Sequence, residues 1–84
     1  MPLFYFHVRH QEGRDEDMDG LSFVDICEAK AGAIQYVREV VVDELRSARA
    51  IAIVALDIVD HSGQAIATIT VEEAILKPLA VRPG

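Results

Sequence analysis

The fold of this 84-residue chain is decided by residues 51–71, IAIVALDIVDHSGQAIATITV. The stretch from Ile51 to Asp60 is apolar and rich in β-branched residues, which is typical of a strand. The residues that follow, Asp60-His61-Ser62-Gly63-Gln64, predict a hairpin turn in which Gly63 takes a left-handed conformation. Residues Ala65 to Val71 then form the partner strand. We expect the rest of the chain to assemble around this antiparallel hairpin.

A long helix is predicted before the hairpin. Residues 25–28, Asp-Ile-Cys-Glu, have the spacing of a capping box, in which Asp25 accepts a hydrogen bond from a free amide and Glu28 reaches back. Small and apolar residues then recur at helical spacing, at Cys27, Ala31, Ile34, Val37, Val41, Leu45 and Ala48. We expect a helix of about six turns from Asp25 to Arg49, with this stripe on its buried face.

The first part of the chain predicts one or two more strands. Residues 3–10, Leu-Phe-Tyr-Phe-His-Val-Arg-His, predict a strand. Alternation places Phe4, Phe6 and Val8 on its core face and Tyr5, His7 and Arg9 on the other. Residues 11–20 predict a turn region, and Leu21-Ser22-Phe23 a short strand beside the first. After the hairpin, Glu72 to Leu76 predict a short helix that Pro78 ends.

These elements predict a single α+β domain over residues 1–84, in which residues 77–84 form a tail. Their order is strand, possible short strand, long helix, two hairpin strands and short helix. The simplest way to bury their apolar surfaces is a small antiparallel sheet of three to four strands with the long helix packed across one face.

Charge and composition exclude several function classes. The net charge is −6, and the acids concentrate in residues 11–28, so the chain has no basic stripe for binding nucleic acid. The longest apolar run, residues 50–56, is much shorter than the ~20 residues of a membrane helix. The single Cys27 cannot form an intrachain disulfide. We therefore expect a cytoplasmic protein that binds neither nucleic acid nor membrane.

The acidic turn at residues 15–20, Asp-Glu-Asp-Met-Asp-Gly, has the alternating Asp residues and the Gly that open an EF-hand calcium loop. The twelfth position of such a loop should be a bidentate Glu, but it is Ile26 here. A predicted strand, and not a helix, precedes the turn. A solvated acidic turn is therefore the preferred interpretation, and divalent-cation (calcium) binding through Asp15, Asp17 and Asp19 is the alternative function.

No motif for catalysis or for a cofactor is present. His7 and His10 lie three residues apart on a strand and project to opposite faces. Cys27 is expected to be a buried apolar residue, and the neighbouring acids oppose its ionisation. We therefore expect no enzyme activity and no cofactor. An unrecognised enzyme that uses His7 with Tyr5 or Arg9 would need a pocket on the sheet face.

Surplus apolar residues point to protein association instead. Residues 50–59 are apolar on both strand faces until Asp57, and Val42 falls near the polar side of the helix, whereas an open sheet face is usually polar. The alternative is that the short helix and the tail cover this face. We expect a non-enzymatic protein-interaction or regulatory module that forms a homodimer or binds an unidentified protein partner. The expected interface residues are Ile51, Ile53, Val59, Tyr5 and His7.

The sequence also resembles a known family. The similar segments are residues 4–9, Phe-Tyr-Phe-His-Val-Arg, then Asp19-Gly20, Asp25 before an Ala-rich helix, Asp57-Ile58-Val59-Asp60-x-x-Gly63, Ala67-Thr68-Ile69 and Glu72-Glu73-Ala74. Over about residues 2–76 the chain resembles small bacterial proteins classified as domain of unknown function 6894. It departs from them at Val40-Val41-Val42, where more charge is usual, and at Thr70-Val71, where a Pro-Phe-like pair is usual. The resemblance implies a compact α+β domain, bacterial and cytoplasmic, and assigns no catalytic residues.

Overall fold

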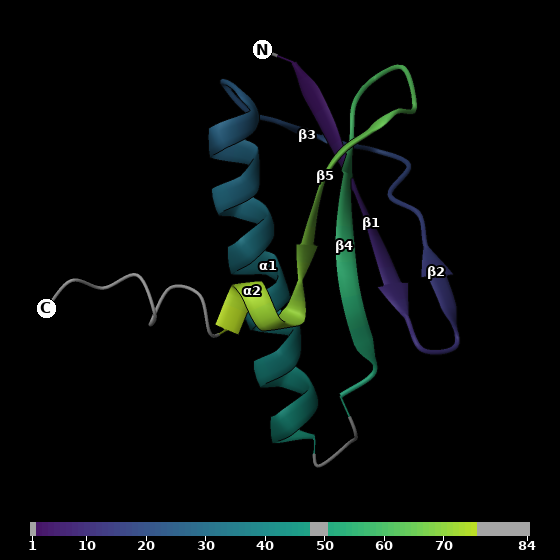
Figure 1. Ribbon diagram of the computed structural model, residues 1–84, viewed down its shortest axis with the longest axis vertical. Coiled ribbons are helices and arrows are strands. Elements are labelled where there is room, and N and C mark those ends of the chain that lie inside the picture. The colour runs from purple at the N-terminus through teal and green to yellow at the C-terminus, as the bar shows by residue number, and fades with distance from the viewer. Residues whose placement is uncertain (1, 48–50, 76–84) are drawn as a thin grey trace, which may run out of the picture.

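The computed structural model describes residues 2–47 and 51–75. Their helices and strands are β1 (Leu3–His10), β2 (Gly13–Asp15), β3 (Leu21–Ser22), α1 (Ile26–Arg46), β4 (Ile53–Val59), β5 (Ala65–Thr70) and α2 (Val71–Ile75). Figure 1 shows one sheet with α1 running along it and α2 crossing α1. The predicted α+β class is therefore confirmed. Neither of these helices is long and apolar enough to cross a membrane.

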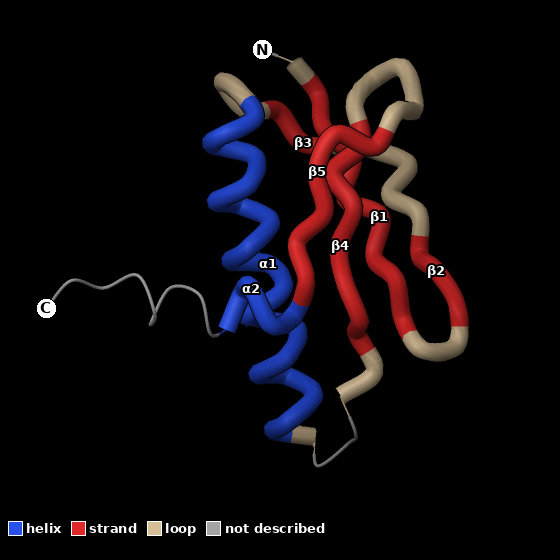
Figure 2. The backbone as a smooth tube through the Cα atoms, in the orientation of Figure 1, coloured by secondary structure: helices blue, strands red, loops and turns tan. Residues whose placement is uncertain are grey.

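The sheet is antiparallel throughout and has the strand order β2-β1-β4-β5. The tube in Figure 2 separates these strands from the helices and turns. The short strand β3 pairs with the start of β1, which confirms the predicted pairing of the segment at 21–23. Residues 11–20 were predicted as a turn region, but they contain β2, which pairs with the end of β1. The hairpin is confirmed, and Gly63 has a φ of 89°.

The core lies between α1 and one face of the sheet. Phe4, Phe6 and Val8 are buried there, as predicted. On β4, Leu56 and Ile58 are completely buried, and they lie opposite Val8 and Phe6 in the register with β1. The short helix α2 packs on the same side of the sheet, because it contacts α1 and its Ala74 belongs to this core. It therefore does not cover the opposite face.

The buried face of α1 consists of Ala29, Ala33, Val37 and Val41. The predicted stripe is correct at the last two of these residues but wrong at both ends. Cys27, which was expected to be buried, is exposed, and Ala31 and Leu45 are exposed as well. The predicted stripe repeats about every 3.5 residues, so it drifts around a straight helix of about 3.6 residues per turn.

Small residues face the core in the first half of α1 because aromatic rings occupy the space beside them. Phe23 stacks on Phe6 with their ring centroids 5.7 Å apart. A Cβ atom on Gly32 would lie 3.0 Å from the Phe23 ring, so this glycine permits the close packing of α1 on Phe23. The remaining predictions for this part of the chain, Ala48 and Arg49, and the predicted tail at 77–84 lie outside the described residues.

The capping box at the start of α1 is confirmed. The Oδ1 atom of Asp25 accepts a hydrogen bond from the N–H of Glu28 at 2.9 Å. The Oε1 atom of Glu28 reaches back to the N–H of Val24, also at 2.9 Å. The first bond gives a partner to an amide that the helix itself leaves free, and the second links Glu28 to the residue before the cap.

Replacing the capping residue is expected to weaken the whole domain. Asp25→Ala should lower the free energy of unfolding by about 1 kcal/mol, because the amide of Glu28 loses its acceptor. Urea unfolding followed by circular dichroism measures this change. Asp25→Asn keeps an acceptor oxygen and should lie within a few tenths of a kcal/mol of the unmodified protein. Equal losses for the two variants would show that capping is not the cause.

Candidate functional site

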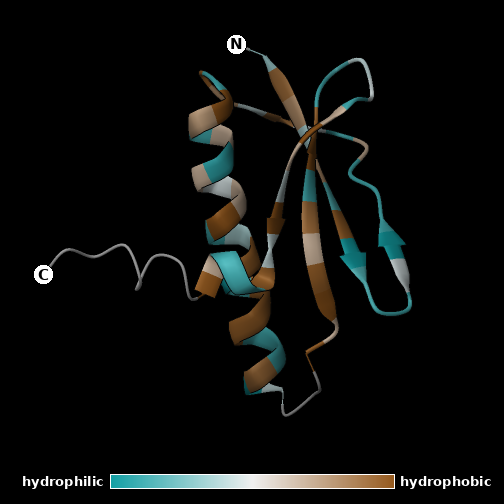
Figure 3. Cartoon of the chain, viewed as in Figure 1, coloured by the Kyte–Doolittle hydropathy of each residue, from teal (hydrophilic) through white to brown (hydrophobic). Residues whose placement is uncertain are grey.

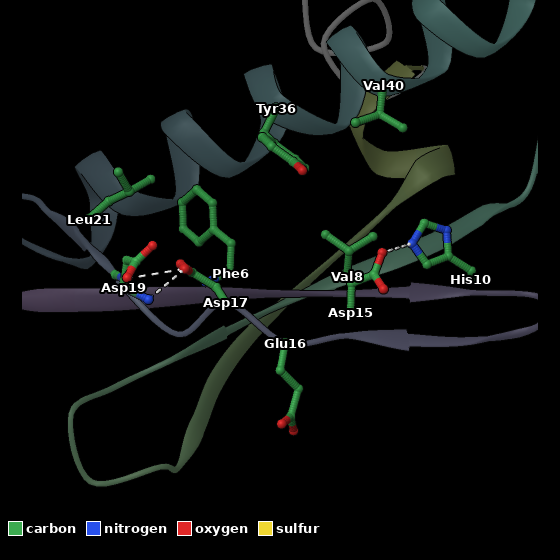
Figure 4. Close-up of a pocket in the computed structure, with 11 residues that line it drawn as sticks. Phe6, Val8, His10, Asp15, Glu16, Asp17, Asp19, Leu21, Tyr36 and Val40 are labelled. Carbon is green, nitrogen blue, oxygen red and sulfur yellow. Dashed lines mark hydrogen bonds and ion pairs between the residues drawn. The ribbon is translucent and has the colours of Figure 1, made fainter.

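An open groove of about 490 Å³ lies between α1 and the edge of the sheet at β1 and β2. We call it the acidic groove. Figure 4 shows Phe6 and Val8 rising from β1 towards Tyr36 and Val40 of α1. The other lining residues come from the end of β1, from β2 and from the segment that leads to β3, and they are His10, Asp15, Glu16, Asp17, Asp19, Gly20 and Leu21.

The groove exists because α1 packs mainly over β4 and β5. Phe6 and Val8 on the core face of β1 are still buried, and they form the bottom of the groove. Phe6 meets the Tyr36 ring edge-on, with the centroids 6.4 Å apart. Tyr36 and Leu21 remain 43% and 49% exposed, so the groove presents apolar surface to solvent.

Asp17 is the structural centre of the acidic turn. Strands β2 and β3 pair with the two ends of β1 on the edge away from β4, and they leave the middle of that edge without a partner strand. One carboxylate oxygen of Asp17 fills this gap by accepting from the N–H of Phe6 at 3.3 Å. The other accepts from the N–H groups of Asp19 at 3.0 Å and Gly20 at 3.2 Å. Asp17 also donates its own N–H to Nδ1 of His7, at 3.1 Å.

These contacts shift the ionisation of Asp17. Its partial burial alone would raise its pKa, but the N–H groups of Gly20, Asp19 and Phe6 and the nearby His7 outweigh that effect. The pKa of Asp17 therefore lies below its ordinary value of 3.8. Hydrogen bonds to the charged form of a carboxylate favour that form.

The other predicted cation ligands do not converge with Asp17. Asp15 pairs with Nε2 of His10 at 2.8 Å. Asp19 is exposed. Among residues 2–47 and 51–75, no three His, Cys, Asp or Glu side chains are grouped so that they could hold a metal ion. The arrangement thus gives the calcium prediction no support, since the carboxylate oxygens of Asp17 already accept backbone amides.

On the face of the sheet opposite α1, charged and polar side chains bond across three strands. Arg9 contacts both carboxylate oxygens of Asp57, at 3.1 and 3.2 Å. The hydroxyl of Thr68 donates to the same carboxylate at 2.7 Å. His7 accepts a hydrogen bond from Asp17 as well, so both His7 and Arg9, which were predicted for this face, have partners within the fold.

The predicted interface residues fall into two groups. Ile53 and Val59 are each only 4% exposed, so they present almost no surface to a partner. Their apolar character serves burial within the monomer, because β4 is the central strand between β1 and β5. Ile51 is exposed, and Tyr5 and His7 are half-buried.

Exposed aliphatic side chains also occur near the end of α1 and near the start of β4. Together we call them the aliphatic end patch: Val42, Leu45, Ile51 and Val54. Glu44 of α1 accepts a hydrogen bond from the N–H of Ala52, which holds the two segments together. Figure 3 shows hydrophobic colouring at the lower ends of both. From the sequence, Ile51 was predicted to be an interface residue and Val42 to lie near the polar side of the helix, but Leu45 was predicted to be buried.

A domain of unknown function (DUF6894) matches residues 3–72 of the chain. Comparison with curated proteins and with solved structures gave no significant match.

Proposed function

The chain belongs to the family of the domain of unknown function DUF6894, and from its surfaces we propose that it is a non-enzymatic protein-interaction module that self-associates as a homodimer. The proposal places it in the bacterial cytoplasm. The observation that carries it is the aliphatic end patch.

The patch favours a second copy of the chain as partner. Exposed aliphatic side chains occur near the end of α1 and near the start of β4, and exposed apolar surface marks interaction sites where it is contiguous. In a two-fold dimer the same patch of each subunit meets its counterpart, so an apolar surface is complementary to itself. Homodimer interfaces are also more apolar than the interfaces of transient complexes. Leu45 is 61% exposed, and the proposal of a dimer rests mainly on this residue.

The polar residues of the sheet support the non-enzymatic part of the proposal. Catalysis needs a nucleophile or an acid–base pair that is open to substrate. The carboxylate of Asp57 is bonded to Arg9 and Thr68. Nδ1 of His7 accepts from the backbone of Asp17. These groups hold strands and the acidic turn in place.

Sedimentation velocity over a wide concentration range tests self-association. The protein should sediment as a dimer at high concentration and dissociate on dilution. Leu45→Lys places a charge in the patch and should keep the protein monomeric at every concentration, because burial of an unpaired ammonium group is unfavourable. Its folding should be unaffected, since the side chain is exposed.

Val24→Lys is the matched control. Val24 is also 61% exposed, but it precedes α1 and lies outside the patch. This variant should dimerise as the unmodified protein does. A chain that stays monomeric at the highest concentration, or equal loss of the dimer in the two variants, would contradict the proposal.

A further inference from the structure

We propose that the acidic groove binds a short segment of a partner protein that carries both aliphatic and basic side chains. The groove shares no residue with the aliphatic end patch. The inference therefore goes beyond self-association and does not depend on it.

The floor and one wall of the groove are apolar. Phe6 and Val8 form a floor that belongs to the core, and Tyr36 and Leu21 leave part of their apolar surface open above it. An aliphatic side chain placed between them would be removed from water on several sides, which is favourable by about 25 cal/mol per Å² of apolar surface. A hydrated cation would gain nothing from this floor.

The rim of the groove is negatively charged. Asp15, Asp17 and Asp19 line the groove, whereas no Lys or Arg is among its lining residues. The side chain of Glu16 points away from the groove in Figure 4, and its Oε2 atom lies 3.7 Å from Nη2 of Arg14. The rim therefore presents a negative field, which attracts Lys and Arg side chains of a partner.

The apolar surface and the negative charge of the groove together favour a peptide that carries both aliphatic and basic side chains. Asp17 is held by three backbone amides and Asp15 pairs with His10, so Asp19, which is exposed, is the carboxylate best placed to meet a basic side chain. Acidic peptides are repelled by the rim. Basic peptides without aliphatic residues leave the exposed surface of Tyr36 and Leu21 uncovered, and purely aliphatic ones leave the carboxylates without a counter-charge.

Fluorescence anisotropy with labelled ten-residue peptides tests this proposal. The probe alternates Leu and Arg, and the two comparison peptides alternate Leu with Glu and Ser with Arg. We expect the Leu-Arg peptide to bind at least about tenfold more tightly than either comparison peptide. Its affinity should fall between ~50 and ~300 mM salt, because salt screens the rim. Equal binding of the Ser-Arg peptide would overturn the proposal, since attraction would then be by charge alone.

Variants locate the binding to the groove. The double variant Asp15→Asn/Asp19→Asn should weaken binding of the Leu-Arg peptide at least about tenfold. The matched control Glu12→Gln/Glu72→Gln also removes two negative charges, but from outside the groove. It should bind the peptide as the unmodified protein does. Tyr36→Ser should weaken binding through the apolar wall, with the melting temperature as a check on folding. Equal weakening in the control would overturn the proposal.

The monomeric variant separates this inference from the proposed function. Leu45→Lys leaves the groove unchanged and should bind the peptide with unaltered affinity. Loss of peptide binding in Leu45→Lys would overturn the independence of the two surfaces. A dimer that does not bind the peptide would overturn only the groove proposal.

Discussion

Leu56→Ala is expected to lower the free energy of unfolding by about 2–5 kcal/mol, the range observed for buried leucines. Leu56 has no exposed surface and lies in the middle of β4, between Val8 on one neighbouring strand and Ile69 on the other. Its removal leaves a cavity where α1 packs on the sheet. Small domains hold a total stability near the lower end of about 5–15 kcal/mol, so the variant should be largely unfolded in moderate urea.

Ile66→Ala is the control for this prediction. Ile66 lies on the neighbouring strand β5, outside the aliphatic end patch, and is exposed, so its truncation should cost well under about 1 kcal/mol. Urea titration followed by circular dichroism measures both variants. A loss at Leu56 no larger than that at Ile66 would show that the sheet and α1 do not share the single core described above.

The elements that follow from local chemistry could be predicted from the sequence. Gly63 within the Asp60–Gln64 turn predicts the hairpin because the left-handed conformation is easiest for glycine. The three-residue spacing of Asp25 and Glu28 predicts the start of α1 because their side chains can meet free amides there. The core face of β1 followed from alternation alone.

The rotation of α1 could not be predicted in the same way. Hydrophobic periodicity weights a residue by its polarity, but Ala29 and Ala33 face the core because of their small size, which makes room for the rings of Phe6 and Phe23. The acidic groove was missed for a related reason. It depends on the position of α1 over β4 and β5 and away from β1, and no local pattern encodes that offset.

The acidic turn shows a further limit of sequence interpretation. A carboxylate that calcium would bind and one that accepts backbone amides have the same residue type and can have the same spacing. Asp17 takes the second role because β1 has free amides next to the turn. Gly20, with a φ of 79°, allows the tight loop around the Asp17 side chain, but a calcium loop needs a glycine at the same position, so this residue does not separate the two roles. A Cβ atom there would also lie 2.9 Å from the ring of Tyr5.

Asp17→Ala is expected to lower the free energy of unfolding by about 2–3 kcal/mol, because hydrogen bonds to a charged acceptor are the strong ones. The amide of Phe6 would lose its acceptor in the middle of β1, and the amides of Asp19 and Gly20 would lose theirs in the turn. Urea unfolding at neutral pH measures the loss. Asp19→Ala, at an exposed neighbouring position, should cost much less.

The contribution of Asp17 should also depend on pH, which a purely steric effect would not. Since its pKa is lower in the folded protein than the ordinary 3.8, the folded state binds the proton less readily than the unfolded chain. The stabilisation is therefore complete above the unfolded pKa and is lost as the pH falls through the folded pKa. The difference in unfolding free energy between the unmodified protein and Asp17→Asn should shrink when the pH is lowered from neutral to below 3.8. Asp60, whose pKa is also lowered, chiefly by the Ser62 hydroxyl, is present in both proteins and cancels in this comparison. A difference that stays constant with pH would show that the charge of Asp17 is not what holds the turn against β1.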